Sequence, residues 1–267
     1  MSTVLFDMDC TLTPARKKIE TNMIRVLSRL LNLTKVGIVT GSGFNYIEDQ
    51  LGSMWDSINC PNLNNLTLYP CNGTKHYEWN GMKWVQKSDN NMMYHVGLGA
   101  FQELLRNVVK LQLKAMTNEE LLGELLVFGH FTSNRGSLLN WCMIGRDATE
   151  KDRKIFEAID EEKCVRTILK SELDFLLEAS GSTRGKFTTA LGGKTSVDIY
   201  PIGWNKTFTL KNFYKGQDVY FIGDNCVKGG NDHEIYEEVL QNGLGAFQTS
   251  GPEETIKLIE EHIIPNL

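Results

Sequence analysis

The sequence predicts an α/β protein whose core is a parallel sheet and which carries an inserted α+β domain. Three observations predict this fold. Both ends of the chain alternate short apolar runs with helical periodicity, the middle carries hairpin signals set apart from helical ones, and aspartates follow apolar runs at both ends. Parallel units flanking an antiparallel module indicate that the middle is an insertion.

The first part of the chain has the pattern of a parallel α/β unit. Residues 4–6 form a short apolar run, and residues 19–31 place apolar side chains at helical spacing. Residues 35–39 favour a second strand, which ends in a Thr-Gly-Ser-Gly turn. A helix over residues 44–51 is expected to follow.

The middle of the chain has the pattern of an antiparallel module. Asn80-Gly81 between aromatic residues is a strong hairpin signal, and two further hairpins are expected around Arg135-Gly136-Ser137 and Gly192-Gly193. Helical periodicity covers residues 98–113, 150–160 and 166–177. The hairpins and helices are segregated from one another, which favours an α+β domain.

The last part of the chain returns to the α/β pattern. Helices are expected over residues 206–214, 232–240 and 252–263, and strands over residues 218–222 and 244–247. We therefore expect a core made of residues 1–85 and 202–267, with an α+β cap of residues 86–201 inserted between them.

Composition excludes several classes of protein. The chain has 267 residues and a formal net charge of −5 at pH 7, which argues against a nucleic-acid-binding protein. Its apolar runs are too short for a membrane span, and we expect no signal peptide. The six cysteines form no C-x-x-C pair, so we expect reduced thiols and a cytoplasmic location rather than a disulfide framework or a zinc site.

Acidic, hydroxyl and basic side chains stand where the predicted core strands end. Asp7 and Asp9 follow the first strand and point to the same side of an extended chain. Thr40 and Asp224 end two further strands, and Lys206 opens the helix before the second of these. Ligands bind beyond the carboxyl ends of the strands in an open α/β sheet, so these residues predict one site.

This set of residue types suits phosphoryl transfer. Clustered carboxylates repel one another without a cation, and a site with few oxygen ligands suits Mg²⁺. An aspartate beside Mg²⁺ can attack phosphorus, and a second acid can move a proton to or from the alcohol or water. Lys206 would add positive charge, and the helix after Thr40 would offer backbone N–H groups to phosphate. We expect Asp7 to attack and Asp9 to transfer the proton.

Four features of the sequence resemble the motifs of the haloacid-dehalogenase superfamily. They are D-x-D-x-T at residues 7–11, Thr40, Lys206, and Gly-Asp…Asn-Asp at residues 223–232. Residues 145–153, 195–206 and 223–236 resemble segments of eukaryotic-type phosphomannomutases. The resemblance implies a Rossmann-like core with an inserted cap. It also implies an enzyme that interconverts mannose 6-phosphate and mannose 1-phosphate through an aspartyl-phosphate, with a hexose 1,6-bisphosphate as activator, in mannose metabolism and GDP-mannose biosynthesis.

The resemblance also assigns roles to residues. Asp7 would be the nucleophile and Asp9 the general acid/base, and Mg²⁺ would be held by the Asp7 side chain, the Asp9 backbone carbonyl and the Asp224 side chain. The substrate would be held by Arg16, Arg135, Arg146, Arg153, Ser196 and Asp198. Supporting residues of the metal, or a second cation site, would include Asn231, Asp232, Tyr236 and Glu238. A homodimer through the cap is implied as well.

The cap residues can be examined on their own spacing. Thr149-Glu150-Lys151-Asp152 resembles a capping box, which would place Arg153 in the first turn of a helix. Ser196 and Asp198 would face the same way on a strand. Arg135 and Arg146, if they share one strand, would lie roughly 25 Å apart along it and could not hold one phosphate. Either the strand bends, or Arg135 contacts a different part of the substrate or the core.

Plainer interpretations remain open for some residues. Asn231 and Asp232 could simply cap a helix, and Arg16 could be a surface charge. Arg146 and Arg153 could form solvent-exposed ion pairs with nearby glutamates.

Two departures from the family pattern keep other functions open. Cys10 stands where the family commonly has glycine, and Thr40 is more typical of sugar phosphatases than of mutases. A sugar-phosphate phosphatase is therefore the alternative enzyme. A phosphosugar-binding protein without activity is a third possibility, which the retained acids and Lys206 disfavour.

Overall fold

The computed structural model describes residues 2–55, 60, 62–122 and 126–267. The chain divides into two compact units. The core unit comprises Met1–Asp89 and Trp204–Leu267, and the cap unit comprises Asn90–Gly203. The first boundary lies a few residues beyond the expected position because the strand that precedes it continues to Asp89. In the described part of the chain, no helix has both the length and the apolar character needed to cross a bilayer.

A seven-stranded sheet forms the centre of the core unit, with the order β11-β10-β1-β2-β3-β4-β5. Five strands pair in parallel: β1 (Thr3–Phe6), β2 (Lys35–Val39), β3 (Leu66–Tyr69), β10 (Val219–Gly223) and β11 (Gly245–Gln248). The hairpin of β4 (Lys75–Trp79) and β5 (Trp84–Asp89) extends one edge in antiparallel pairing. From β1 the sheet grows toward β2 in one direction and toward β10 in the other, so β1 stands at the topological switch point.

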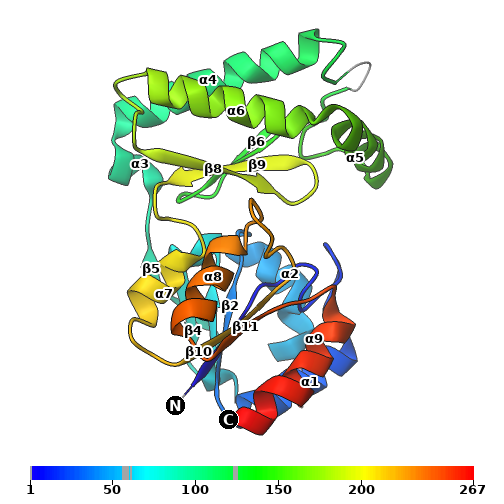
Figure 1. Cartoon of the computed structure of the whole chain (residues 1–267), viewed down its shortest axis with the longest axis vertical. Helices are drawn as coiled ribbons and strands as arrows, with labels where there is room; N and C mark the ends of the chain where they lie inside the picture. The colour runs from blue at the N-terminus through cyan, green and yellow to red at the C-terminus, as the bar shows by residue number, and fades with distance from the viewer. Residues whose placement is uncertain (1, 56–59, 61, 123–125) are drawn as a thin grey trace. The chain divides into compact units, whose positions relative to one another are not determined.

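Helices cover both faces of the core sheet. The helices of this unit are α1 (Thr21–Leu31), α2 (Phe44–Trp55), α7 (Thr207–Phe213), α8 (His233–Asn242) and α9 (Pro252–Leu258). Val4 and Phe6 pack with α1, α2 and the C-terminal segment, whereas Leu5 packs with α7 and α8 on the other face. Figure 1 shows α1 beside α9, and α7 beside α8. Because β1 is buried on both faces, residues 4–6 form the continuous apolar run typical of a parallel strand.

The cap unit is an antiparallel sheet with helices on one face. The sheet has the order β6-β7-β9-β8 and consists of β6 (Thr132–Asn134), β7 (Leu139–Cys142), β8 (Phe187–Gly192) and β9 (Ser196–Pro201). The helices are α3 (Met92–Val96), α4 (Leu98–Thr117), α5 (Glu150–Lys163) and α6 (Val165–Ala179). Figure 1 shows α4 and α6 running together along this sheet. Buried Trp141 donates its indole N–H to Gln112 of α4 at 2.7 Å, which ties the sheet to the helices.

Most expected elements are present, and the differences have local causes. β3 and α3 were not predicted. β3 has only four residues and follows an Asn-rich stretch, and it pairs with β2 only in the folded sheet. The expected last helix changes after Leu258, where Ile259–Ile263 form a π-helical turn. The predicted capping box at the start of α5 is confirmed, with Thr149 and Asp152 bonding each other's backbone N–H groups.

Candidate active site

Asp7 emerges from the carboxyl end of β1 at the switch point of the core sheet. Its backbone N–H donates to the carbonyl of Ile222 at 2.9 Å, so the residue continues the pairing with β10. Its side chain is only 5% exposed. A carboxylate held this rigidly beside two strand ends occupies the place where α/β sheets bind ligands.

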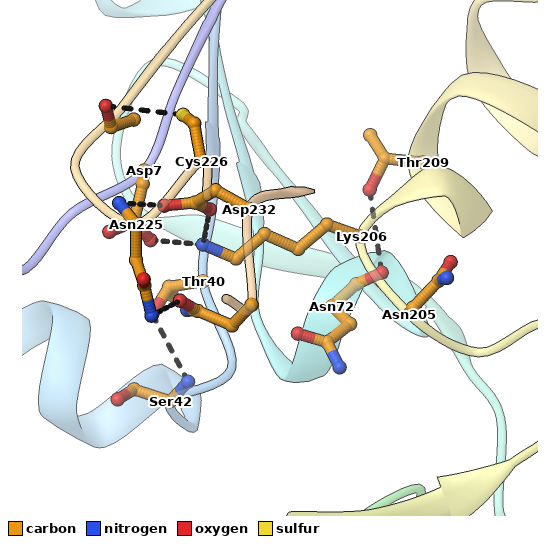
Figure 2. A network of polar contacts seen from close by, with 12 residues as sticks. Asp7, Thr40, Ser42, Asn72, Asn205, Lys206, Thr209, Asn225, Cys226 and Asp232 are labelled. Carbon is orange, nitrogen blue, oxygen red and sulfur yellow. Dashed lines mark hydrogen bonds and ion pairs between the residues drawn. The ribbon is translucent and has the colours of Figure 1, made fainter. Parts of the chain in front are cut away.

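Lys206 lies between two of the site's carboxylates (Figure 2). Its ammonium group donates to Asp7 Oδ1 and, at 2.5 Å, to Asp232 Oδ1, and the side chain is 1% exposed. Burial alone would lower the pKa of Lys206, but the charges of Asp232 and Asp7 outweigh it and raise the pKa well above its usual value. The lysine is therefore a fixed positive charge.

The remaining negative charge fits a divalent cation. Among the described residues, Asp7, Asp224 and Asp232 place one carboxylate oxygen each within 4.8 Å of one another. Three carboxylates face one ammonium, and burial together with the charge of Asp232 raises the pKa of Asp224 to about 6. A hard divalent ion such as Mg²⁺ would balance this charge with the oxygen donors it prefers.

The structure distinguishes the roles of these three carboxylates. Asp232 uses one oxygen for Lys206 and the other to accept from the backbone N–H of Asn225 at 3.2 Å. Asp232 directly precedes α8, yet its side chain does not cap that helix. Asp7 and Asp224 are thus the carboxylates best placed to hold an ion, and Asp232 holds the lysine.

Residue 223 must be glycine because the side chain of Asp232 lies very close to it. A Cβ atom added at Gly223 would lie 2.7 Å from Asp232 Oδ2 and 2.8 Å from its Cγ. Since real Cβ contacts are not this short, any larger residue would displace the carboxylate that holds Lys206. The glycine of the Gly-Asp motif is therefore explained by space.

Asp9 faces a different group of residues from Asp7. Its Oδ1 accepts from the backbone N–H of Arg16 at 3.0 Å, from Gln50 Nε2 at 3.2 Å and from the Tyr46 hydroxyl at 3.3 Å. Burial, and then the charge of Asp9, raise the pKa of Tyr46 to about 12, so its hydroxyl remains a donor. All three contacts reach one oxygen and thereby fix how the carboxyl group is turned.

Tyr46 and Gln50 were not predicted from the sequence. They stand four residues apart on α2, the helix that follows β2 and the Thr40 turn. Their spacing places them on the same helix face. This helical spacing is the only sequence signal for the pair, and it does not indicate that both side chains contact Asp9.

We expect Gln50→Leu to lower kcat on the order of 10- to 100-fold, because Asp9 would lose a donor that fixes its orientation. Steady-state turnover of the hexose phosphate that the sequence predicts as substrate measures the effect. Tyr46→Phe, which removes only a hydroxyl, should act in the same direction but more weakly. Glu48→Gln, on the exposed side of α2, is the matched control. Unchanged turnover in Gln50→Leu would contradict a role for this contact.

Thr40 organises the turn before α2. Its Oγ1 accepts from the backbone N–H of Ser42 at 3.1 Å, and its backbone carbonyl accepts from Asn72 at 2.8 Å. The side chain is buried. In this structure Thr40 shapes the loop that leads into the N-terminus of α2, where phosphate binding was predicted.

Cys10 and Arg16, which follow β1, both have left-handed backbone conformations. Cys10 has φ of 59° and Arg16 has φ of 60°. Glycine adopts such angles without strain, which gives a physical reason for the glycine that the family commonly has at the position of Cys10. The Arg16 side chain is exposed and lies near Tyr46, where its charge acts to lower that tyrosine's pKa.

The residues considered for a second cation site have separate partners. Asn231 Oδ1 accepts from Asn225 Nδ2 at 3.1 Å, and Glu238 forms an ion pair with Lys211 at 3.6 Å. Tyr236 packs against the apolar cluster under α8.

The predicted cap residues Arg146, Ser196 and Asp198 meet around one side chain. Asn140 of β7 donates from Nδ2 to Ser196 Oγ at 2.9 Å and to Asp198 Oδ1 at 2.6 Å. Its Oδ1 accepts from Arg146 NH1 at 3.0 Å. Asn140 was not predicted, because in the sequence it is only a polar residue in an apolar run. Asp198 pairs directly with Asn140 across the two strands.

Arg153 is buried, and its guanidinium donates hydrogen bonds to groups within the cap unit. Its guanidinium donates to the carbonyls of Ala148 at 3.1 Å and Arg146 at 2.9 Å, and to Thr195 Oγ1 at 2.8 Å. The alternative of a solvent-exposed ion pair with Glu150 or Glu157 is therefore wrong for this residue, since those glutamates pair with lysines. Arg153 fixes the loop that carries Arg146.

Arg135 and Arg146 do not share a strand. Arg135 stands in the turn between β6 and β7, where its N–H donates to the Leu138 carbonyl at 2.8 Å. β7 ends at Cys142, and the chain turns at Gly145, which has φ of 83°, before Arg146. The condition of one shared strand is therefore not met, and the guanidinium of Arg146 donates back to Asn140 of β7.

The comparisons with known proteins agree with this geometry. The model of the eukaryotic phosphomannomutase family matches residues 23–265. The chain belongs to this family. A phosphomannomutase of Nicotiana benthamiana is 31% identical, with 97% of this chain and 93% of that protein covered. A phosphomannomutase of Saccharomyces cerevisiae is 29% identical, with 97% and 92% covered.

Solved structures similar to the chain are phosphatases and nucleotidases with the same fold. An IMP-nucleotidase of Plasmodium falciparum has a TM-score of 0.66 at 15% identity, with 97% of this chain and 67% of that one covered. A trehalose-6-phosphate phosphatase of Aspergillus fumigatus has a TM-score of 0.53 at 16% identity, with 97% and 91% covered. At such identities the likeness concerns the fold alone. Together the comparisons confirm the predicted haloacid-dehalogenase-like fold and the prediction of a phosphomannomutase.

Proposed function

We propose that this phosphomannomutase family member interconverts mannose 6-phosphate and mannose 1-phosphate through a phosphoryl group carried on Asp7. The observation that best supports the proposal is the buried arrangement of Lys206 between Asp7 and Asp232, beside Asp224, at the switch point of the core sheet. A buried carboxylate with a fixed cation beside it is suited to attack a phosphate, whose charge it would otherwise repel.

Each core residue has a step in this scheme. An Asp7 oxygen attacks phosphorus of a hexose bisphosphate, and the bond to the sugar oxygen breaks. Asp9 gives the departing oxygen its proton. In the second step it takes a proton from the sugar hydroxyl that attacks phosphorus of the phosphorylated Asp7, and the bond between phosphorus and the Asp7 oxygen breaks. Lys206 neutralises charge on the transferring group. Mg²⁺ held by Asp7 and Asp224 would supply further positive charge to the phosphoryl oxygens.

The cap supplies the groups for the rest of the substrate. Arg146 offers a guanidinium that can bind phosphate in bidentate geometry, and Asp198 offers a carboxylate for sugar hydroxyls. Arg153 contributes by holding the backbone of Arg146. Arg16 and Arg135 stay predicted substrate contacts.

The mutase and the phosphatase differ in what attacks the phosphorylated Asp7. A mutase must favour a bound sugar hydroxyl over water, which needs the sugar held in a reactive position. The cap residues favour the mutase, and Thr40 favours the phosphatase. With hexose 1-phosphate and Mg²⁺, we expect isomerisation that a hexose 1,6-bisphosphate stimulates and only slow release of free phosphate. Free phosphate formed as fast as substrate disappears, with no stimulation by bisphosphate, would establish the phosphatase instead.

We expect Arg146→Ala to cost about 2–4 kcal/mol in kcat/KM for hexose phosphates, because a charge-assisted contact to the distal phosphate is lost. Hydrolysis of an aryl phosphate, which has no distal group, should change little. Arg184→Ala is the control, since the side chain of this exposed cap arginine donates to the Glu178 carbonyl. Equal losses on both substrates would contradict the role of Arg146.

We also infer a homodimer formed through the cap. Val109, Leu113 and Met116 are exposed at helical spacing on α4, and Phe175 is exposed on neighbouring α6. An apolar surface of this kind is typical of an interface. A mass in solution that falls from dimer to monomer in Leu113→Asp would support it. A cytoplasmic location is inferred from the six cysteines, all of which are free thiols.

A further inference from the structure

Asn140 lies at the centre of the cap's polar face. It stands in the middle of β7 and is 2% exposed. Its hydrogen-bond partners are the polar or charged side chains of Arg146, Ser196 and Asp198. Its neighbour Trp141 points to the opposite face and binds α4. The contacts of Asn140 therefore belong to the face of the sheet away from the helices.

The amide of Asn140 stands between opposite charges. Its single carbonyl oxygen accepts from the Arg146 guanidinium, and its two N–H groups donate to Asp198 and Ser196. An amide is neutral and carries both kinds of group, so it satisfies a cation and an anion together. Without it, the guanidinium and the carboxylate would lie on either side of an empty space and could pair with each other.

We propose that Asn140 is a positioning residue that keeps Arg146 and Asp198 apart, so that the guanidinium stays oriented for a phosphate and the carboxylate for sugar hydroxyls. A direct Arg146–Asp198 ion pair would have to be broken before either residue could bind substrate. This inference rests on the proposed function, because it assigns Asn140 to the same phosphosugar site.

Gly192 of β8 lies close to the same Asp198 carboxylate, on the side of β9 away from β7. A Cβ atom added there would lie 2.8 Å from both Cγ and Oδ2 of Asp198. The Gly192 carbonyl accepts from Ser196 Oγ at 2.6 Å. Its φ is not in the left-handed region, so the need for glycine here is one of space. Asn140 and Gly192 thus fix Asp198 between them.

The test measures binding of mannose 1-phosphate to the whole protein by calorimetry, together with turnover. Asn140→Leu keeps a similar volume and removes the polar contacts, and Gly192→Ala pushes the carboxylate without removing any partner. We expect each variant to weaken binding on the order of 10- to 100-fold, with aryl phosphate hydrolysis changed little. If Asn140→Leu does not fold, binding by Gly192→Ala still tests the proposal.

The control and the double variant separate positioning from general stability. Thr189→Val breaks a partly buried hydrogen bond to Asp174 on the helix-covered face of the same sheet and should leave binding unchanged. In a double-mutant cycle, the combined loss of Asn140→Leu and Arg146→Ala should be smaller than the sum of their separate losses, because both act on the same guanidinium, and what Asn140→Leu still adds reflects Asp198. Additive losses would overturn the proposal, as would unchanged binding in Asn140→Leu.

The outcomes distinguish this inference from the proposed function. If the unaltered protein binds mannose 1-phosphate and the variants bind it weakly, but none isomerises it, the proposed function fails and the role of Asn140 stands. If the unaltered protein isomerises the sugar and Asn140→Leu binds it equally well, the role of Asn140 fails and the proposed function stands.

Discussion

Asp7→Asn should abolish turnover, with a loss on the order of 10⁴-fold or more, while the protein stays folded. An amide does not attack phosphorus, and it is a poor ligand for Mg²⁺. The fold should persist because Asn has nearly the same shape, and because removing one of three crowded carboxylates relieves repulsion. Lys206 would keep its contact with Asp232.

The measurement pairs isomerisation kinetics with thermal unfolding. Asp218→Asn is the control, since Asp218 is exposed at the opposite end of β10. Substantial activity in a folded Asp7→Asn protein would refute covalent catalysis by this residue.

Lys206→Met should have the largest combined effect, on both stability and activity. Removing the ammonium leaves Asp7 and Asp232 buried without a compensating charge, which costs about 3–5 kcal/mol in free energy of unfolding. Turnover should be lost as well, because the transferring phosphoryl group loses a fixed cation. Denaturant unfolding without added divalent ions measures the first effect.

Two further variants make this prediction specific. Lys211→Met removes a lysine one helical turn later, whose side chain is 58% exposed, and should change stability by less than about 1 kcal/mol. Adding Asp232→Asn to Lys206→Met should recover part of the lost stability, because one uncompensated charge is then gone. A Lys206→Met protein as stable as the unaltered one would show that the carboxylates are not charged as described.

The core of the site could be predicted from the sequence because it follows from topology. Asp7 and Lys206 are 199 residues apart, yet the rule that ligands bind beyond the carboxyl ends of parallel strands brings them to one edge. From the sequence, Asp232 could either cap a helix or support the metal, since aspartate suits both roles. Only its contact with Lys206 distinguishes them.

The residues that orient the catalytic groups could not be predicted. Tyr46 and Gln50 sit on an ordinary helix, and their meeting with Asp9 depends on how α2 packs against β1. Asn140 is a single polar residue in an apolar strand, and its partners are set by the register of β7 against β9. Strand register comes from tertiary packing, and a one-residue slip would turn Asn140 to the other face.

The central claim is that a phosphoryl group passes through Asp7 to a sugar rather than to water. The most direct test loads the protein with radiolabelled hexose 1,6-bisphosphate and Mg²⁺, and then maps the label after acid quenching and digestion. We predict label on the peptide containing Asp7, and its transfer to sugar when unlabelled mannose 1-phosphate is added. Label that never appears on this peptide, or that leaves it only as inorganic phosphate, would contradict the claim.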